Sequence, residues 1–209
     1  MNTQSLVNYG FRVRYPANSI IFVQRDVATK LYYLEKGLVK LSFLSDQGDE
    51  KIVAFIMPGL IFGESAILLK TRYGITATAK EECIVIAYDR LQAAALIRHT
   101  ENFAALVSTS MARELSFLGH QIIGTSFYDT TGRVGHALIN LSHQLEQGND
   151  ATLALTHAEL AKFVGASRIS ITNVLSYLEN KKLVVKGRTA IRIPDRSALK
   201  NWLERQSYI

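Results

Sequence analysis

Cysteine, proline and long apolar runs are scarce in this sequence. One cysteine among 209 residues cannot form a disulfide framework, a four-cysteine zinc site or a cysteine-ligated cluster, which favours a reducing compartment. The most apolar stretch, residues 51–69, is interrupted by Pro58, Gly59 and Gly63, so it does not fit a membrane span. The N-terminal segment lacks the basic and then apolar layout of a signal peptide. We therefore expect a cytoplasmic protein.

The sequence is otherwise rich in apolar residues. Hydrophobic residues make up 48% of the chain and charged residues 20%, which is typical of folded globular proteins and not of disordered ones. A chain of 209 residues can form one large domain or two ordinary ones, because domains commonly have about 100–150 residues.

The net charge of +6 is concentrated in one segment. Residues 156–209 contain 10 of the 24 Lys and Arg residues but only 4 of the 18 Asp and Glu residues, so the rest of the chain is neutral. A basic segment attached to a neutral one favours a polyanionic partner, because Lys and Arg placed on phosphates release counterions. Charge alone leaves open a solvated surface with a chance asymmetry.

Short β-rich segments follow one another between Arg12 and Asp89. They span residues 19–24, 30–37, 38–50, 51–59, 75–79 and 83–89. Gly37, Gly48 and Gly59 recur at even spacing, which favours a small closed or rolled antiparallel sheet. Residues 46–49 predict the reversal of a hairpin. Helices are hard to place from the sequence in this part of the chain.

Beyond Leu91 the spacing of the apolar residues changes to that of a helix. The apolar positions recur every three or four residues, which predicts an amphipathic helix from about Glu101 to Ser126. These positions are Val107, Met111, Leu115, Leu118 and Ile122. Their mean step is close to the repeat of about 3.5 residues in coiled coils, which favours a parallel homodimer. A helix that faces its own core has the same spacing.

A change of direction is predicted after this helix. Asp129 can act as the N-cap of a new helix, so the segment Phe127–Asp129 is a candidate hinge. Residues 146–152 are polar and typical of a turn, which predicts a loop before the basic segment.

The basic segment has the pattern of a helix-turn-helix. Thr156 can cap a first helix, Gly165 permits a left-handed turn, and Ser167 can cap a second helix. The expected inward residues are Leu160, Ala161, Val164, Ile171, Val174, Leu175 and Leu178.

A basic wing is expected next. Residues 183–185 and 190–193 are apolar segments that flank Lys186, Gly187 and Arg188. The alternative interpretation of the whole region is an ordinary helical hairpin.

Three further segments accompany the helix-turn-helix: FGES at 62–65, TATA at 76–79 and DTTGRVGHALINLSHQLE at 129–146. In this order, and at about the usual separations, they resemble the CRP/FNR superfamily of bacterial transcription regulators over nearly the whole chain. The resemblance implies an α+β protein. Its expected parts are an N-terminal β-roll (jelly roll) of the cyclic-nucleotide-binding type (1–100), a dimerisation helix with a hinge (101–128) and a C-terminal winged helix-turn-helix (129–209).

The resemblance also implies partners. A homodimer would bind an inverted-repeat operator in double-stranded DNA, with half-sites about one helical turn apart. RNA polymerase is a further expected partner, as for an activator, although the sequence leaves activation or repression open. A small-molecule effector would bind the roll.

The DNA contacts follow from side-chain chemistry. Arg168 matches the family's arginine near the start of the recognition helix and can pair with guanine O6 and N7. Ile169 favours a thymine methyl group, and Asn173, with Thr172 beside it, favours adenine. Asn173 can also be a solvent-facing residue. The residues expected at phosphates are Thr156, Ser167, Ser170, Lys186 and Arg188.

The effector residues of cyclic-AMP-binding members are only partly present. Glu64 matches the ribose-binding glutamate, but the positions of the phosphate-binding Arg and Ser/Thr hold Tyr73 and Gly74. The candidate positions are Gly63, Glu64, Ser65, Arg72, Tyr73, Gly74, Leu118, Gly119 and Ile122. We expect a pocket between roll and helix for a non-nucleotide ligand, such as a partly apolar or aromatic anion that Arg72 and Tyr73 contact. Arg72 as a surface charge and Glu64 as a structural residue are the alternatives.

Other chemistries are weakly supported. The single Cys83 argues against an iron–sulfur cluster, and isolated histidines argue against haem or another metal. An enzyme with a cupin-like site would need a His-x-His or two-histidine, one-carboxylate pattern, which is absent. The remaining alternatives are a cyclic-nucleotide-responsive regulator and a ligand-independent DNA-binding repressor.

Overall fold

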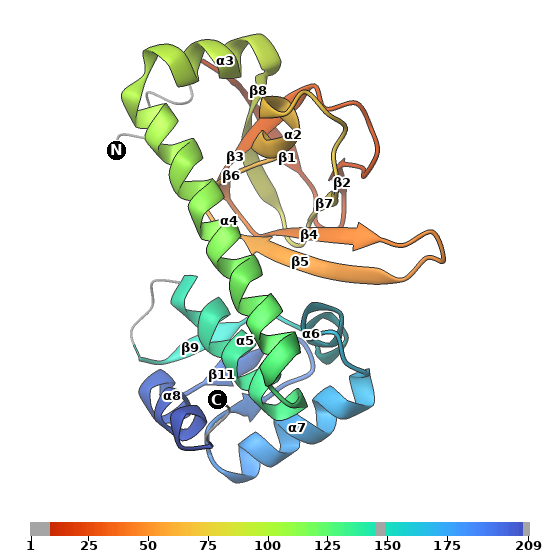
Figure 1. The fold of residues 1–209 in the computed structure, drawn as a ribbon, viewed down its shortest axis with the longest axis vertical. Coiled ribbons are helices and arrows are strands. Elements are labelled where there is room, and N and C mark those ends of the chain that lie inside the picture. The colour runs from red at the N-terminus through yellow and green to blue at the C-terminus, as the bar shows by residue number, and fades with distance from the viewer. Residues whose placement is uncertain (1–8, 145–148, 207–209) are drawn as a thin grey trace. The chain divides into compact units, whose positions relative to one another are not determined.

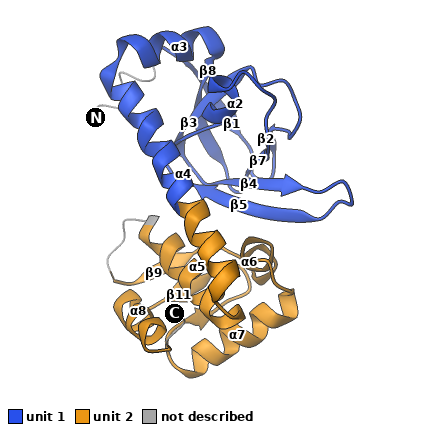
Figure 2. Cartoon of the chain, in the orientation of Figure 1, with its two compact units in different colours: residues 1–116 blue, residues 117–209 orange. Residues whose placement is uncertain are grey.

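The computed structural model describes residues 9–144 and 149–206. The chain divides into two compact units, residues 1–116 and 117–209 (Figure 2). The sequence analysis predicts that the long helix and the hinge, residues 101–128, form a segment separate from the roll and from the helix-turn-helix domain. In the structure the division between the units falls within that helix.

The first unit contains two antiparallel four-stranded sheets (Figure 1). One has the order β1(Phe11–Tyr15), β8(Cys83–Asp89), β3(Lys30–Lys36), β6(Ile61–Phe62), and the other has the order β2(Ile20–Phe22), β7(Thr76–Ala79), β4(Val39–Leu44), β5(Glu50–Ile56). Leu31, Leu34, Leu41, Ile52 and Ile86 are fully buried and form its core. The predicted roll is confirmed, although β1 and β6 were not foreseen.

The β4–β5 hairpin reverses where the sequence predicts it. The Ser45 amide donates to the Asp49 carbonyl at 2.9 Å, and Gly48 has a φ of +88°. A positive φ favours glycine because it has no Cβ. The turn at 46–49 is therefore encoded locally.

Two helices of the first unit lie beside these strands. The short helix α2(Glu64–Leu68) begins after Gly63, whose φ is +78°, and α3(Arg90–His99) begins with a capping box between Asp89 and Gln92. Helix α2 lies in the β-rich part, where the sequence made helices hard to place. Five residues are too few for a helical apolar period to emerge from the sequence.

The long helix α4 spans Glu101–Phe127, which confirms the predicted segment. Near its start, Phe103 and Val107 are buried, and the hydroxyl of buried Ser110 accepts a hydrogen bond from the Ile61 amide at 3.0 Å. The predicted apolar positions beyond Val107 are instead exposed, because no residue that the structure describes covers them.

The second unit contains four further helices and one small sheet. They are α5(Thr130–Gln144), α6(His157–Val164), α7(Arg168–Asn180), α8(Arg196–Arg205) and a sheet of order β10(Val185–Lys186), β11(Ile191–Ile193), β9(Ala151–Leu153). The Asp129 carboxylate accepts a hydrogen bond from the Gly132 amide at 2.8 Å, so the predicted N-cap after the hinge is confirmed.

The loop predicted at residues 146–152 needs a correction. Residues 145–148 lie outside the described residues, but Ala151 and Thr152 belong to strand β9. Ala151 and Leu153 are buried while Thr152 is exposed, and the strand pairs with β11 some forty residues later in the sequence. Such a short strand depends on a distant partner and leaves little local signal.

Candidate nucleic-acid interface and effector site

Two capped helices form the helix-turn-helix. The Thr156 hydroxyl accepts a hydrogen bond from the Glu159 amide at 3.2 Å, and the Glu159 carboxylate accepts one from the Thr156 amide at 2.9 Å. Gly165 ends α6 with φ +78° and ψ +51°. Ser167 accepts a hydrogen bond from the Ser170 amide at 3.0 Å and so caps α7. These caps confirm the predicted helix boundaries.

One face of α7 is free for an external partner. Arg168, Ile169 and Asn173 are exposed, and 74% of the Ile169 surface is accessible. The opposite face buries Ile171, Leu175 and Leu178, as predicted, whereas the predicted inward residue Val174 is only half-buried.

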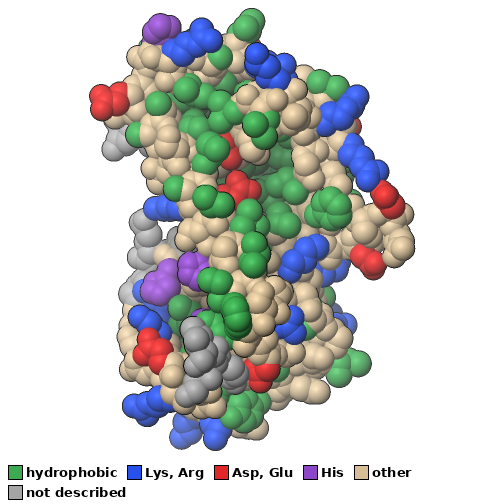
Figure 3. Space-filling model, viewed as in Figure 1, with side chains coloured by type: hydrophobic (Ala, Val, Ile, Leu, Met, Phe, Trp, Pro, Cys, Tyr) green, Lys and Arg blue, Asp and Glu red, His purple; other side chains and the backbone are tan. Residues whose placement is uncertain are grey.

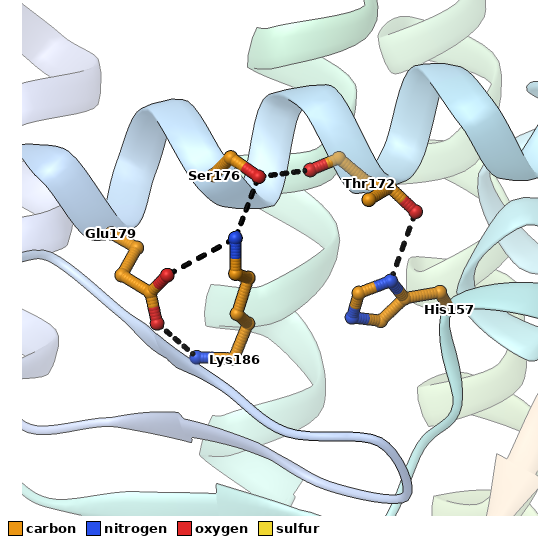
Figure 4. A network of polar contacts seen from close by, with 5 residues as sticks. All are labelled: His157, Thr172, Ser176, Glu179 and Lys186. Atoms are coloured by element: carbon orange, nitrogen blue, oxygen red, sulfur yellow. Dashed lines mark hydrogen bonds and ion pairs between the residues drawn. The ribbon is translucent and has the colours of Figure 1, made fainter.

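Polar side chains fix the position of α7 (Figure 4). The Thr172 hydroxyl lies 3.0 Å from Nδ1 of His157 and also donates to the Arg168 carbonyl, so it connects α7 to α6. The Lys186 ammonium donates to the Ser176 hydroxyl at 2.7 Å and lies 3.2 Å from the Glu179 carboxylate, which connects the wing to the same helix.

The structure therefore divides the predicted DNA residues into two groups. Arg168, Ile169 and Asn173 present their side chains outward, as does Arg188 in the turn of the wing. The hydroxyl or ammonium groups of the other residues already have partners within the domain. These residues are Thr156, Ser167, Ser170, Thr172 and Lys186.

A pair of carboxyl groups lies in the first unit. Glu64, at the start of α2, is 2% exposed and forms a side-chain hydrogen bond with Glu114 of α4. Burial, with a smaller contribution from the neighbouring Glu114, raises the pKa of Glu64 to about 7; burial also raises the pKa of Glu114. Two carboxyl groups in contact share a proton because both cannot ionise cheaply.

Aromatic rings fill the part of the roll next to Gly63. Tyr73 is 5% exposed, stacks on Phe22 with centroids 3.9 Å apart, and donates its hydroxyl proton to the Lys30 carbonyl at 2.5 Å. A Cβ added to Gly63 would lie 3.3 Å from Phe22 and 3.4 Å from Tyr73. Tyr73, a predicted effector-binding residue, therefore lies inside the roll, but its hydroxyl already has a hydrogen-bond partner in the Lys30 carbonyl.

Arg72 and Tyr73 do not converge on one ligand. Arg72 is exposed and donates to the Arg25 carbonyl at 2.8 Å, while the next residue faces the core. Successive residues of an extended segment point to opposite faces, which explains the separation. The expected joint contact of Arg72 and Tyr73 with an anion is therefore not supported.

The other effector candidates are spread over the chain. Ser65 and Gly74 are exposed in the first unit. Leu118 and Ile122 are 39% and 66% exposed on α4 within the second unit, and Gly119 has open space around it.

Comparisons with known proteins agree with this geometry. Residues 12–100 match the cyclic nucleotide-binding domain, and residues 132–202 match the Crp-like helix-turn-helix domain. The chain is 30% identical over 193 residues to the cyclic AMP receptor protein of Thermus thermophilus, covering 92% of this chain and 88% of that protein. The chain belongs to the CRP/FNR superfamily of transcription regulators.

Other members of the superfamily show similar matches. The cAMP-activated global transcriptional regulator CRP of Haemophilus influenzae is 27% identical over 183 residues, covering 85% of this chain and 82% of that one. The structure of FixK2 from Bradyrhizobium japonicum superposes with a TM-score of 0.79 at 20% identity, covering 92% of this chain and 96% of that chain, which supports the fold.

Membership of the CRP/FNR superfamily confirms the predicted fold class and the expectation of a DNA-binding transcription regulator that is not an enzyme. In the described part of the chain, no cluster of three or more potential metal ligands is present. None of the described helices is both long and apolar enough to span a membrane.

Glu114 is a residue that the sequence analysis missed in this CRP/FNR protein. Phe103, Val107, Ser110 and Glu114 follow one another at helical spacing, and the first three are buried. The signal in the sequence was an acidic residue, Glu114, at the helical spacing of the buried positions that precede it. The sequence analysis instead followed the apolar positions Met111 and Leu115, which come directly after Ser110 and Glu114.

We expect Glu64→Gln to change how stability depends on pH. The raised pKa of Glu64 means that the folded state holds its proton more tightly than the unfolded state, whose pKa is near 4.5. The stability of the native protein should therefore fall as pH rises from about 4.5 through about 7. At about pH 8 the variant should be more stable than the native protein, by roughly 1–3 kcal/mol.

Thermal unfolding at about pH 5 and pH 8 measures this difference. The control Glu101→Gln replaces an exposed glutamate at the start of α4, and it should not alter the pH dependence. An equal loss of stability in Glu64→Gln at both pH values would contradict the shared proton.

Proposed function

We propose that the chain is a homodimeric, effector-responsive regulator that binds inverted-repeat promoter DNA. The observation that carries this proposal is the face of α7, where Arg168, Ile169 and Asn173 stand exposed beside two capped helix ends. A helix presented in this way fits the major groove, which is wide enough for an α-helix.

Each exposed residue of α7 suits a different base feature. The planar guanidinium of Arg168 offers two parallel donors to guanine O6 and N7. The Ile169 side chain can contact a thymine methyl group, and the Asn173 amide can pair with adenine N6 and N7. Arg188 and the helix-cap residues Ser167 and Ser170 lie where phosphate contacts would position the helix.

We expect Arg168→Ala to weaken binding to the specific operator by about 1–3 kcal/mol and to relax one base position. Binding of the variant and the native protein to operator and random duplexes at several salt concentrations measures this effect. Lys200→Ala is a matched control, because it removes a basic side chain from α8 and should leave operator preference unchanged. Equal losses on operator and random DNA would refute base recognition by Arg168.

Dimer formation accounts for the exposed face of α4. Met111, Leu115, Leu118 and Ile122 are 41%, 73%, 39% and 66% exposed and follow one another at steps of four, three and four residues. Such spacing lets two helices interdigitate side chains along a left-handed supercoil. Contiguous apolar surface of this kind marks an association site in a protein that is otherwise well packed.

We expect Leu115→Lys to yield a monomer that no longer binds an inverted repeat tightly. Two like charges would face each other at the centre of the predicted helix pair, and the apolar contact would be lost. Light scattering coupled to size-exclusion chromatography measures the mass. The control Leu91→Lys changes a leucine that is 82% exposed on α3 and should remain dimeric. Dimers in both variants would place the interface elsewhere.

The effector is proposed to bind the roll next to Glu64. No Lys or Arg is among the buried residues of the described chain, and the buried acidic residue there is Glu64, which pairs with the half-buried Glu114. A buried cyclic phosphate would thus lack a charged donor, which costs several kcal/mol relative to a paired one. We therefore propose a ligand without a phosphate group, and the two carboxyl groups favour a neutral or cationic molecule over an anion.

The cyclic-nucleotide alternative has its own support. Residues 12–100 match the cyclic nucleotide-binding domain, and the relative of Thermus thermophilus is named a cyclic AMP receptor protein. The proposal and this alternative differ in the ligand that stabilises the folded roll.

We expect cyclic AMP and cyclic GMP to leave the melting temperature unchanged, whereas a neutral or cationic effector should raise it. A ligand at one hundred times its Kd stabilises the folded state by about 2.7 kcal/mol. Differential scanning fluorimetry with both nucleotides and a set of small polar and amine ligands measures the shift. Stabilisation by cyclic AMP would favour the alternative. Operator binding that no ligand changes would favour a ligand-independent repressor.

A further inference from the structure

A cleft lies entirely within the second unit, between the end of α4 and helices α5 and α6. Its polar lining consists of His120, Gln121, Thr125, Arg133, His136 and Asn140. Phe117 and Phe163, whose rings lie 5.2 Å apart, close one side. The cleft is small, with a volume of about 40 Å³, and is continuous with solvent, so it suits a small ion and not the larger ligands of sites of about 300–1,000 Å³. Nothing in the proposed regulator function uses it.

Arg133 contributes a guanidinium group that can donate further hydrogen bonds. One guanidinium nitrogen donates to the Thr130 hydroxyl at 3.1 Å, but the buried Nε has no hydrogen-bond partner among the described residues. The stem of Arg133 lies beside Gly124, where an added Cβ would make an ordinary van der Waals contact with Cγ of Arg133 at 3.8 Å. Buried donors without a partner are rare, because leaving one unsatisfied costs free energy.

Two histidines from different helices face the same cleft. His120 lies on α4, and His136 lies on α5, where its ring stacks on Tyr128 with centroids 4.4 Å apart. Burial lowers the pKa of His136, and His120 lowers it further because two imidazolium ions would repel each other. On the face shown in Figure 3, histidine side chains gather on the second unit.

We propose that this hinge cleft is a binding site for an oxyanion of the phosphate class. Arg133, both histidines and Asn140 can all donate hydrogen bonds, and no Asp or Glu is among the described residues that line the cleft. An arginine that can present parallel donors suits a phosphate or sulfate group. The lining from α6 is apolar, so every charged or titratable group at the cleft favours a negative ligand.

Occupancy of the hinge cleft would connect α4 to α5 directly. His120 precedes the hinge and Arg133 and His136 follow it, so one anion can accept hydrogen bonds from both sides. The cleft residues Phe117, His120 and Gly124 repeat at helical spacing on α4, on a face separate from the stripe of Leu118 and Ile122. Gln121 and Thr125, which also line the cleft, border this stripe, so the centre of the cleft lies away from the surface that the proposed dimer covers and one edge lies beside it.

Isothermal titration calorimetry with inorganic phosphate and with sulfate tests the site in the full chain. Two variants remove donors while keeping the packing: Arg133→Met retains the aliphatic stem, and His136→Phe retains the stacking on Tyr128. We expect the Kd for each anion to rise at least tenfold in Arg133→Met and several-fold in His136→Phe. Circular dichroism of each variant reports whether it folds.

The pH dependence gives a second readout. Sulfate keeps both charges between about pH 6 and pH 8, so any change in its affinity reports the protein. Binding should tighten as the pH falls below about 6.5, because protonation of His136, whose pKa burial lowers, strengthens it, and this dependence should shrink in His136→Phe.

Two controls separate the cleft from other basic surfaces. Arg168→Ala removes the exposed arginine of the recognition helix, and His143→Phe changes an exposed histidine of α5 outside the cleft. Both should bind phosphate and sulfate as the native protein does. Loss of binding in Arg168→Ala with retention in folded Arg133→Met and His136→Phe, or no binding by the native protein at millimolar anion, would overturn the proposal.

Discussion

The unequal burial of α4 is the constraint on which the rest of this molecule depends. The start of the helix packs on the roll through Phe103 and Val107, whereas Leu115 and Ile122 remain uncovered among residues 9–144 and 149–206. A helix gains most of its stability from burying an apolar face, so an exposed stripe of this length needs a second surface. In the proposed dimer, a second copy supplies it, and two recognition helices are then presented together.

The helix-turn-helix could be predicted because its signals are local. Thr156, Gly165 and Ser167 each act on backbone groups within four residues, so their types alone indicate where helices begin and end. The same holds for Asp129 after the hinge and for the turn at 46–49. Strand β9 and helix α2 escaped prediction because they are short and depend on distant partners.

The effector site could be predicted only in part, for a related reason. Glu64 was recognisable from its motif, but its partner Glu114 comes from α4, fifty residues later in the sequence. Likewise, the opposite directions of Arg72 and Tyr73 follow from the register of an extended segment, which composition does not specify. The residues of the hinge cleft come from three helices and share no spacing that a motif could capture.

The contact between Thr172 and His157 also limits how related regulators can diverge. Thr172 occupies a position on the recognition helix beside Asn173, yet its hydroxyl holds α7 against α6 at 3.0 Å from the imidazole. A change at Thr172 would alter the scaffold, whereas Ile169 and Asn173 have no comparable structural role among the described residues. New operator preferences in descendants of this protein should therefore arise at Ile169 and Asn173 first, with Thr172 retained as an anchor.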